Sequence, residues 1–220
     1  MKKIAALTTA MILISAISVL AVPIDLRTDF AIPSGSNSYY YADAGLTLTA
    51  FPEKATLYQD STDGVGVIYS YEMDEIEGSE FLNLHFDEEQ YLTSMLITDL
   101  FTEPYNDGSG VFSEVGYYSF NYSITTDTGD WTEMIAPIGN APSPATNGEL
   151  EIVLAPTAIT DIWFRAPGLM NWDPVKSKYR EDHEFSVVRL DVIPVPEPSS
   201  LLLLGTGLIG LAGFRKKTLS

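Results

Sequence analysis

Short runs in which apolar and polar residues alternate dominate the middle of the chain. Residues 44–51, 81–86 and 149–154 carry an apolar side chain at nearly every second position. Alternation with a period of two is typical of a half-buried β-strand, because successive side chains point to opposite faces of a sheet. Further runs rich in Val, Ile, Tyr, Phe or Thr predict strands over residues 66–71, 92–101, 115–124, 159–165 and 184–192.

Turn-forming residues separate these predicted strands. Clusters of Gly, Asp, Asn, Ser and Pro occur at residues 60–64, 106–110, 127–130, 137–144 and 147–148. Only residues 88–98 could be drawn as a helix, and their β-branched context favours a strand. The pattern predicts an all-β domain over residues 22–193, built as an antiparallel two-sheet β-sandwich that is jelly-roll-like.

The N-terminal segment has a different pattern from the middle. Lys2 and Lys3 precede an uncharged apolar stretch over residues 4–20, with small residues at positions −3 and −1 of a cleavage site after Ala21. This order is typical of a secretory signal peptide, whereas a buried helix does not explain the paired lysines. We therefore predict a signal peptide over residues 1–21 and export through the Sec translocon.

The C-terminal segment, residues 194–220, also differs from the middle. An apolar run without charge over residues 201–214 lies between Val-Pro-Glu-Pro at residues 195–198 and Arg-Lys-Lys at residues 215–217. A helix of that length spans about 21 Å, less than the roughly 30 Å hydrocarbon core of a bilayer. Cations behind such a run stay on the cytoplasmic side. The segment predicts a short transmembrane helix that anchors the domain transiently outside the inner membrane.

The same segment resembles the PEP-CTERM sorting signal of Gram-negative bacteria in its Pro-Glu-Pro, its Gly-rich apolar run and its basic end. The resemblance implies processing by an exosortase, a membrane protease. The residues that would carry the sorting motif are Pro196, Glu197, Pro198, Arg215, Lys216 and Lys217. It further implies a cell-surface or extracellular protein associated with exopolysaccharide and biofilm. An ordinary single-span anchor is the alternative, but it does not explain the Pro-Glu-Pro.

The middle of the chain resembles, in segments between residues 55 and 97 and at residues 184–192, domains found upstream of this sorting signal. Such domains have no agreed biochemical activity. This second resemblance therefore concerns fold and location, and it implies no reaction.

Charge and composition narrow the function classes. Acidic side chains outnumber basic ones by 30 to 12, which gives a formal net charge of −18. All the acidic residues lie between Asp25 and Glu197, and five basic ones lie in the two terminal segments, so the exported part is more acidic still. Such a chain repels a phosphate backbone, and nucleic acid is not an expected partner. The absence of cysteine excludes disulfides, thiolate metal sites and cysteine nucleophiles.

Sequence motifs for catalysis are also missing. The chain has no HExxH, GxSxG, P-loop or GxGxxG pattern. His85 and His183 are each predicted to be surface or hydrogen-bonded residues. We predict a protein that is not an enzyme. A secreted hydrolase is the least supported alternative. A pair of carboxylates at a suitable distance would be the only evidence for it, and with 30 acidic residues such a pair would occur in any fold.

A calcium site is one binding hypothesis. Acidic turns supply the oxygen ligands that Ca²⁺ prefers, and Asp60, Asp63 and Glu80 are the candidate ligands. No complete Ca²⁺-binding loop is present in the sequence, and no other cofactor is expected.

Carbohydrate binding is the other hypothesis. Trp131 and Trp172 lie near Gly, Asp and Pro, which favours exposed rings that could stack on sugars. Trp163 alternates with apolar neighbours and is expected in the core, and Tyr39–Tyr41 is expected to form an edge strand. A carbohydrate-binding or Ca²⁺-stabilised adhesion module acting on exopolysaccharide is therefore the alternative to a simple exported surface protein.

Overall fold

The computed structural model describes residues 20–69, 75–78, 80–104, 111–137, 148–167, 170–173, 178–181, 183–195 and 205. The predicted signal peptide up to residue 19 lies outside these residues, as does the predicted transmembrane helix over residues 201–214 except for Gly205. Within the described residues, no helix combines the length and the apolar character needed to cross a membrane.

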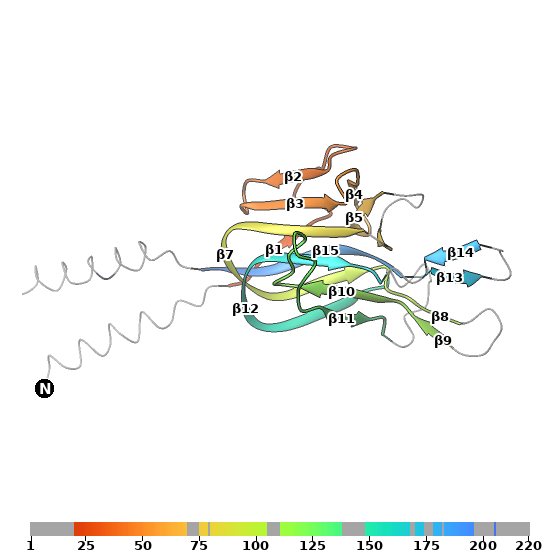
Figure 1. Cartoon of the computed structure of the whole chain (residues 1–220). Coiled ribbons are helices and arrows are strands. Elements are labelled where there is room, and N and C mark those ends of the chain that lie inside the picture. Colours follow the sequence, from red (N-terminus) through yellow and green to blue (C-terminus); the bar gives the residue numbers. More distant parts are fainter. Residues whose placement is uncertain are drawn as a thin grey trace, which may run out of the picture.

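The domain consists of β-strands joined by turns (Figure 1). In chain order they are β1 (Val22–Asp25), β2 (Ser38–Tyr41), β3 (Leu46–Phe51), β4 (Thr56–Asp60), β5 (Gly64–Ile68), β6 (Ile76–Glu77), β7 (Phe81–Thr98), β8 (Thr102–Pro104), β9 (Val111–Ser113), β10 (Val115–Ser119), β11 (Thr132–Ile135), β12 (Leu150–Arg165), β13 (Met170–Asp173), β14 (Lys178–Glu181) and β15 (Glu184–Pro194).

One antiparallel sheet of 11 strands makes up most of the domain, with the central order β11-β10-β12-β7-β15-β5-β4. β1 and β6 pair with β15, and β2 pairs with β3, which in turn pairs with β7. The hairpins β8–β9 and β13–β14 are separate two-stranded sheets. The all-β antiparallel prediction is confirmed. The two separate sheets of a jelly-roll-like sandwich are not what is observed, because one continuous sheet curls over on itself.

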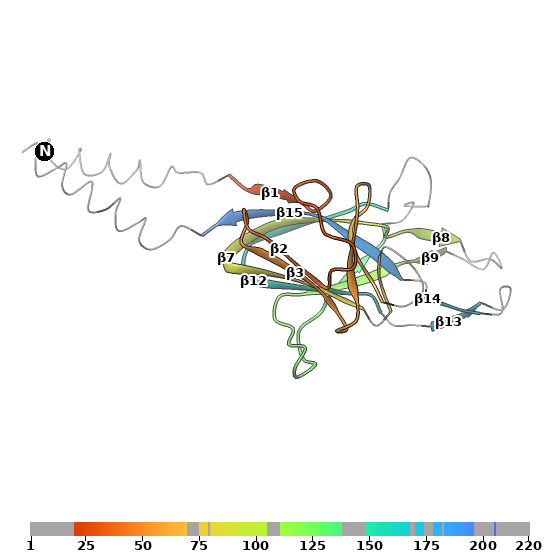
Figure 2. The same ribbon diagram turned by 90° about the horizontal axis from the view of Figure 1, so that it is seen from above.

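The long strands β7 and β12 carry the sheet around this curve. β7 has 18 residues and pairs with β3 along residues 81–86 but with β15 along residues 90–98. β12 runs beside β7, with a register shift between Val153 and Thr157 where Pro156 lies. Proline cannot donate to a β-ladder, so it suits an interruption of the pairing. The two halves of the sheet therefore form two layers (Figures 1 and 2).

The hydrophobic core lies between these layers. Side chains at alternate positions point inward, as the sequence pattern predicts. Those on β3, β7 and β15 that are fully or almost fully buried include Leu46, Leu48, Ala50, Leu82, Leu84, Phe86, Phe185, Val187 and Leu190. Phe164 of β12 meets Phe185 edge-on, with ring centroids 6.3 Å apart, and so links the two layers. Burial of each large apolar side chain contributes about 1.5–3 kcal/mol.

Some predicted strand boundaries are wrong. Residues 81–86 and 92–101 were expected to form two strands, as were residues 149–154 and 159–165, but each pair belongs to one long strand, β7 or β12. The polar residues 87–89 interrupt the alternation because they are exposed at the bend of β7. The strand expected over residues 115–124 ends at Ser119. The edge-strand prediction for Tyr39–Tyr41 is confirmed, since among the strands that the structure describes β2 pairs with β3 alone.

Gly64 provides a test of how closely β5 approaches β15. Its φ is +109°, and a Cβ at this position would lie 2.4 Å from the backbone oxygen of Val187. We expect Gly64→Ala to lower the free energy of unfolding by about 2–4 kcal/mol, because it combines backbone strain with a backbone clash. Gly35 is the matched control. It has a φ of +78° but nothing within 4 Å of the added Cβ.

Gly35→Ala should therefore cost only about 1 kcal/mol, which is the strain without the clash. Urea denaturation of the two variants measures the difference. Equal losses for both would show that the close approach at Gly64 is not rigid.

Candidate functional site

The outer face of one layer presents a row of side chains that crosses five strands. The register places Phe51 of β3 beside Phe81 of β7, then Arg165 of β12, Tyr117 of β10 and Glu133 of β11. Neighbours in such a row interact directly because their Cβ atoms lie about 4.5–5.5 Å apart. The row brings aromatic and charged groups together from segments far apart in the sequence.

Arg165 is the centre of this outer face. Its guanidinium carbon lies 4.3 Å from the ring centroid of Trp131 and 5.6 Å from that of Tyr117. The hydroxyl of Tyr117 donates a hydrogen bond to Glu133 at 3.4 Å. A guanidinium above an aromatic face gains about 0.5–2 kcal/mol. Arg165 therefore holds Trp131 against the sheet.

The loop between β10 and β11 packs on the same face through the rings of Tyr122 and Trp131. Tyr122 stacks on Phe81 at 5.6 Å between centroids and contacts Trp163 at 5.2 Å and Trp131 at 4.8 Å. Burial raises the pKa of the Tyr122 hydroxyl above its ordinary value, and that hydroxyl donates to Asp127 at 3.0 Å.

Hydrogen bonds within the loop hold its outer part in place. Asn121 donates to the carboxylate of Asp130 at 2.9 Å and accepts from the Asp130 backbone at 2.8 Å. Backbone pairing joins Ser123 to Thr128. The loop is thus an ordered projection from the layer, and it stands out from the strands in Figure 2.

These contacts change the interpretation of the tryptophans. Trp131 was expected to be exposed, but it is half-buried, because the strand register brings Arg165 to it. Trp163 is buried, as expected, at 7% exposure, although it lies on the outer face beneath Tyr122 and beside Phe51. The backbone of Trp172 lies in β13, while its side chain is outside the described part of the structure.

Polar side chains continue the outer face beyond the aromatic cluster. Nδ1 of His85 lies 3.0 Å from Oδ1 of Asp161, and the amide of Asn83 donates to the same oxygen at 3.4 Å. The hydroxyl of Tyr40 donates to Asp87 at 2.7 Å. His85 is therefore a hydrogen-bonded surface residue, as predicted. The partly exposed His85 and Asp161 beside aromatic rings could bind a hydroxyl-rich ligand.

The sequence alone did not identify Arg165, Asp161 or Tyr122 as members of this surface. Asp161 is 76 positions from His85, and only the pairing of β7 with β12 joins them. Periodicity could show that these side chains share an outward direction on their own strands. It could not show which residues face one another across strands.

The candidate calcium ligands do not converge on a metal site. Oδ1 of Asp60 accepts the backbone N–H groups of Thr62 and Asp63, at 2.6 and 3.3 Å, and the first of these lowers the pKa of Asp60. Glu80 is buried and accepts the N–H of Glu77 at 3.1 Å. Across the described ranges, no group of three or more His, Asp or Glu side chains could hold a metal ion. Calcium binding at Asp60, Asp63 and Glu80 stays a prediction.

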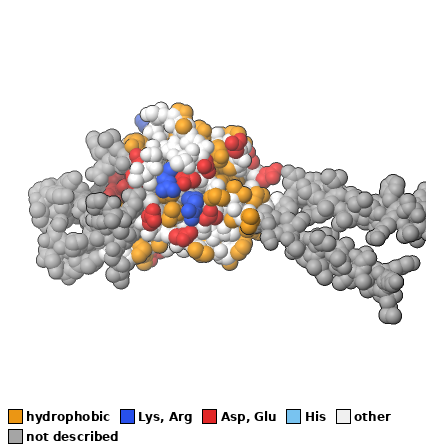
Figure 3. Space-filling view, turned by 180° about the vertical axis from the view of Figure 1, so that it is seen from behind, with side chains coloured by type: hydrophobic (Ala, Val, Ile, Leu, Met, Phe, Trp, Pro, Cys, Tyr) orange, Lys and Arg blue, Asp and Glu red, His pale blue; other side chains and the backbone are white. Residues whose placement is uncertain are grey.

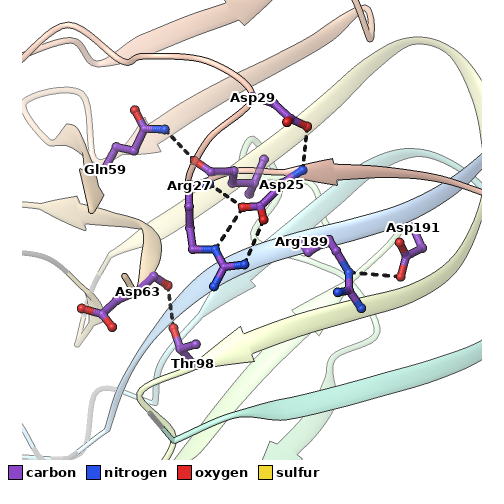
Figure 4. A network of polar contacts seen from close by, with 9 residues as sticks. Asp25, Arg27, Asp29, Gln59, Asp63, Thr98, Arg189 and Asp191 are labelled. Atoms are coloured by element: carbon purple, nitrogen blue, oxygen red, sulfur yellow. Dashed lines mark hydrogen bonds and ion pairs between the residues drawn. The ribbon is translucent and has the colours of Figure 1, made fainter. Parts of the chain in front are cut away.

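Two arginines near β1 and β15 are engaged by carboxylates. Arg27 forms a fork with Asp25 through two hydrogen bonds of 3.0 and 2.9 Å, and this pairing lowers the pKa of Asp25. Arg189 contacts Asp191 at 3.3 Å (Figure 4), and it also contacts Glu151 at 3.2 Å. Figure 3 shows the few basic side chains on one face next to acidic ones. No concentrated positive charge is visible on the described part of that face.

Gln59 fixes the chain just after β1. Its side-chain amide donates to the carbonyls of Leu26 and Phe30 at 2.6 and 2.9 Å, and its oxygen accepts the N–H of Ile32 at 2.9 Å. These bonds tie the start of the domain to β4 (Figure 4), and the backbone pairing of β1 ties it to β15. The network is structural, since all of its bonds link parts of the same domain.

The free energy of unfolding is expected to depend on pH through His183. This residue is buried, Nδ1 accepts the N–H of Val115 at 3.0 Å, and burial lowers its pKa below the ordinary 6.5. The unfolded chain takes up a proton near pH 6.5 while the folded chain stays neutral to lower pH. Stability from this group is therefore complete above pH 6.5 and falls as the pH drops toward the folded-state pKa.

His183→Asn should remove this part of the pH dependence, because an amide oxygen can accept from Val115 without titrating. Denaturation at about pH 7.5 and about pH 5.5 measures it. Val153→Ala, at an exposed site on β12 that does not titrate, is the control and should retain the wild-type dependence. An unchanged pH dependence in His183→Asn would contradict the assignment.

The sorting-motif residues begin directly after the last strand. β15 ends at Pro194, and Pro196, Glu197, Pro198, Arg215, Lys216 and Lys217 all lie outside the described residues. A family model for the PEP-CTERM protein-sorting motif matches residues 194–217. The chain carries a PEP-CTERM sorting signal. The signal starts at the final residue of β15, so no further domain separates the two.

Other comparisons add little to the PEP-CTERM match. No curated protein matches the chain. Among solved structures, wild-type discoidin II from Dictyostelium discoideum aligns with a TM-score of 0.34 and 13% sequence identity, over 75% of this chain. This chain spans only 61% of the length of discoidin II. Similarity at that level does not indicate a shared fold or function.

Proposed function

We propose that this chain is the precursor of an exported, non-enzymatic protein of the cell surface or extracellular matrix. The PEP-CTERM match at residues 194–217 is the observation that carries the proposal. In this proposal the Sec translocon exports the chain across the inner membrane of a Gram-negative bacterium. The tail then anchors the β-domain there until an exosortase removes the tail. The released, acidic domain would associate with exopolysaccharide in a biofilm.

Transfer of the tail to another protein tests this proposal. Residues 194–220 are fused to the end of an unrelated exported β-domain and produced in an exosortase-bearing host and in a derivative that lacks the enzyme. We expect a shortened, released protein only in the first host. A control fusion that ends at Pro194 should be released in both. Equal release of the tailed fusion from both hosts would contradict the proposal.

Carbohydrate binding by the outer face is a second proposal. It is supported by the half-buried ring of Trp131, packed against Tyr122, and by the polar groups of His85, Asp161 and Asn83 that continue the same surface. Bound sugars are commonly held by a few oriented polar groups beside aromatic rings. Repulsion by the net charge of −18 favours neutral or amine-bearing glycans over acidic ones.

Trp131→Ala is expected to weaken glycan binding about tenfold, for a stacking loss near 1.4 kcal/mol. Binding to an array of neutral, amine-bearing and acidic glycans measures the effect. Trp172→Ala tests the other predicted ring, and Val153→Ala, at an exposed site on β12, is the control. Because Trp131 contacts Arg165, thermal melting must show that the variant is folded. Unchanged binding by the folded Trp131 and Trp172 variants would exclude both rings.

A further inference from the structure

The two ends of the β-domain lie side by side. β1 pairs antiparallel with β15, and the register places Val22 opposite Val192. The domain therefore begins at the point where β15 is about to end. Both views show the chain entering and leaving the same end of the domain (Figures 1 and 2).

The bend of β7 lies at this same end. Gln90 pairs with Pro194, and Tyr91 pairs with Ile193. The turn between β2 and β3 also reaches it, since the N–H of Asp87 donates to the carbonyl of Gly45 at 2.8 Å. We call this end, formed by Val22, residues 87–91 and Pro194, the bend pole. The hairpins β8–β9 and β13–β14 lie at the other end, the hairpin pole (Figure 1).

Only a short stretch of chain separates the bend pole from the apolar run that is proposed to form the membrane anchor. Only residues 195–200 lie between the end of β15 and the first residue of the apolar run, Leu201. The seven Cα–Cα steps from Pro194 to Leu201 reach at most about 25 Å, even when fully extended. By comparison, β15 from Glu184 to Pro194, which ends at the bend pole, covers about 33 Å.

We infer that the anchored precursor turns its bend pole toward the lipid surface and presents its hairpin pole outward. This inference rests on the proposed anchoring of the tail. A spacer shorter than the domain prevents the hairpin pole from replacing the bend pole at the membrane. The hairpin pole then faces away from the lipid surface and is accessible to a matrix partner.

Because the bend pole is acidic, it does not itself bind the lipid surface. Asp87, Glu88 and Glu89 are all exposed there, and Asp43 is exposed in the neighbouring turn. Acidic side chains are repelled by anionic lipid headgroups. The domain is therefore held at the bilayer by its tail alone, and removal of the tail releases it completely.

Position-specific energy transfer to lipid tests this arrangement. The full chain contains no cysteine, so Glu89→Cys and Ile135→Cys each give a single labelling site. Glu89 is exposed at the bend pole, and Ile135 is 52% exposed at the hairpin end of β11. The labelled full-length precursor is reconstituted in phosphatidylethanolamine and phosphatidylglycerol vesicles that contain an acceptor lipid.

We expect severalfold more quenching by the acceptor lipid at position 89 than at position 135. Equal or reversed quenching in precursor that floats with the vesicles would overturn the orientation while leaving the anchoring intact. Failure of the precursor to float would overturn the anchoring and the orientation together. A flexible spacer inserted after Val195 is the second variant, and it should reduce the difference between the two positions.

Discussion

Pro196→Ala combined with Glu197→Ala is expected to leave most of the precursor uncleaved in the membrane. In the PEP-CTERM proposal these side chains are read by the protease, and they lie beyond Pro194, where β15 ends. Two lost contacts worth about 1.4 kcal/mol each would slow cleavage about a hundredfold. Pulse-labelling followed by membrane fractionation measures the half-life of the precursor.

Ser199→Ala combined with Ser200→Ala is the matched control for the tail. It changes two neighbouring residues of the same linker and leaves the Pro-Glu-Pro unchanged. We expect these changes to leave cleavage close to the wild-type rate. If the Pro196 and Glu197 variant is cleaved as fast as this control, recognition does not depend on the Pro-Glu-Pro.

Phe185→Ala is expected to lower the free energy of unfolding by about 3–5 kcal/mol. Phe185 is fully buried, lies on β15 and meets Phe164 of the opposite layer edge-on. A Cβ added at Gly116 would lie 2.7 Å from its ring, so β10 also packs closely against it. Truncation would therefore leave a cavity between the two layers at a point where three strands meet. Urea denaturation measures the loss.

Val153→Ala is the control for this core substitution. Val153 is 76% exposed on β12, and its truncation should change stability by no more than about 0.5 kcal/mol. Phe185→Leu should cost less than Phe185→Ala, because it fills most of the cavity. A loss in Phe185→Ala as small as that in Val153→Ala would mean that the two layers do not pack together as described.

Local patterns predicted the parts of the fold that depend on one strand at a time. The alternation of Leu46, Leu48 and Ala50 correctly predicted the inward face of β3. The three consecutive tyrosines correctly predicted an edge strand. These predictions succeed because strand periodicity acts within a few residues.

Features that depend on pairing between distant segments could not be predicted in this way. The polar residues 87–89 resemble a loop, yet β7 continues through them because both its halves find partners, first β3 and then β15. The contact between Arg165 and Trp131 likewise depends on register. The sorting signal was identifiable from the sequence, since a protease reads a short contiguous stretch.

Intact-mass analysis of the native exported protein, purified from its own host, measures whether both terminal segments are removed. We expect the mass of a chain that begins at Val22 and ends close to Pro198, without the apolar run or the cations behind it. A released protein that still carries Arg215 would contradict the proposal. So would an intracellular soluble protein with both terminal segments uncut.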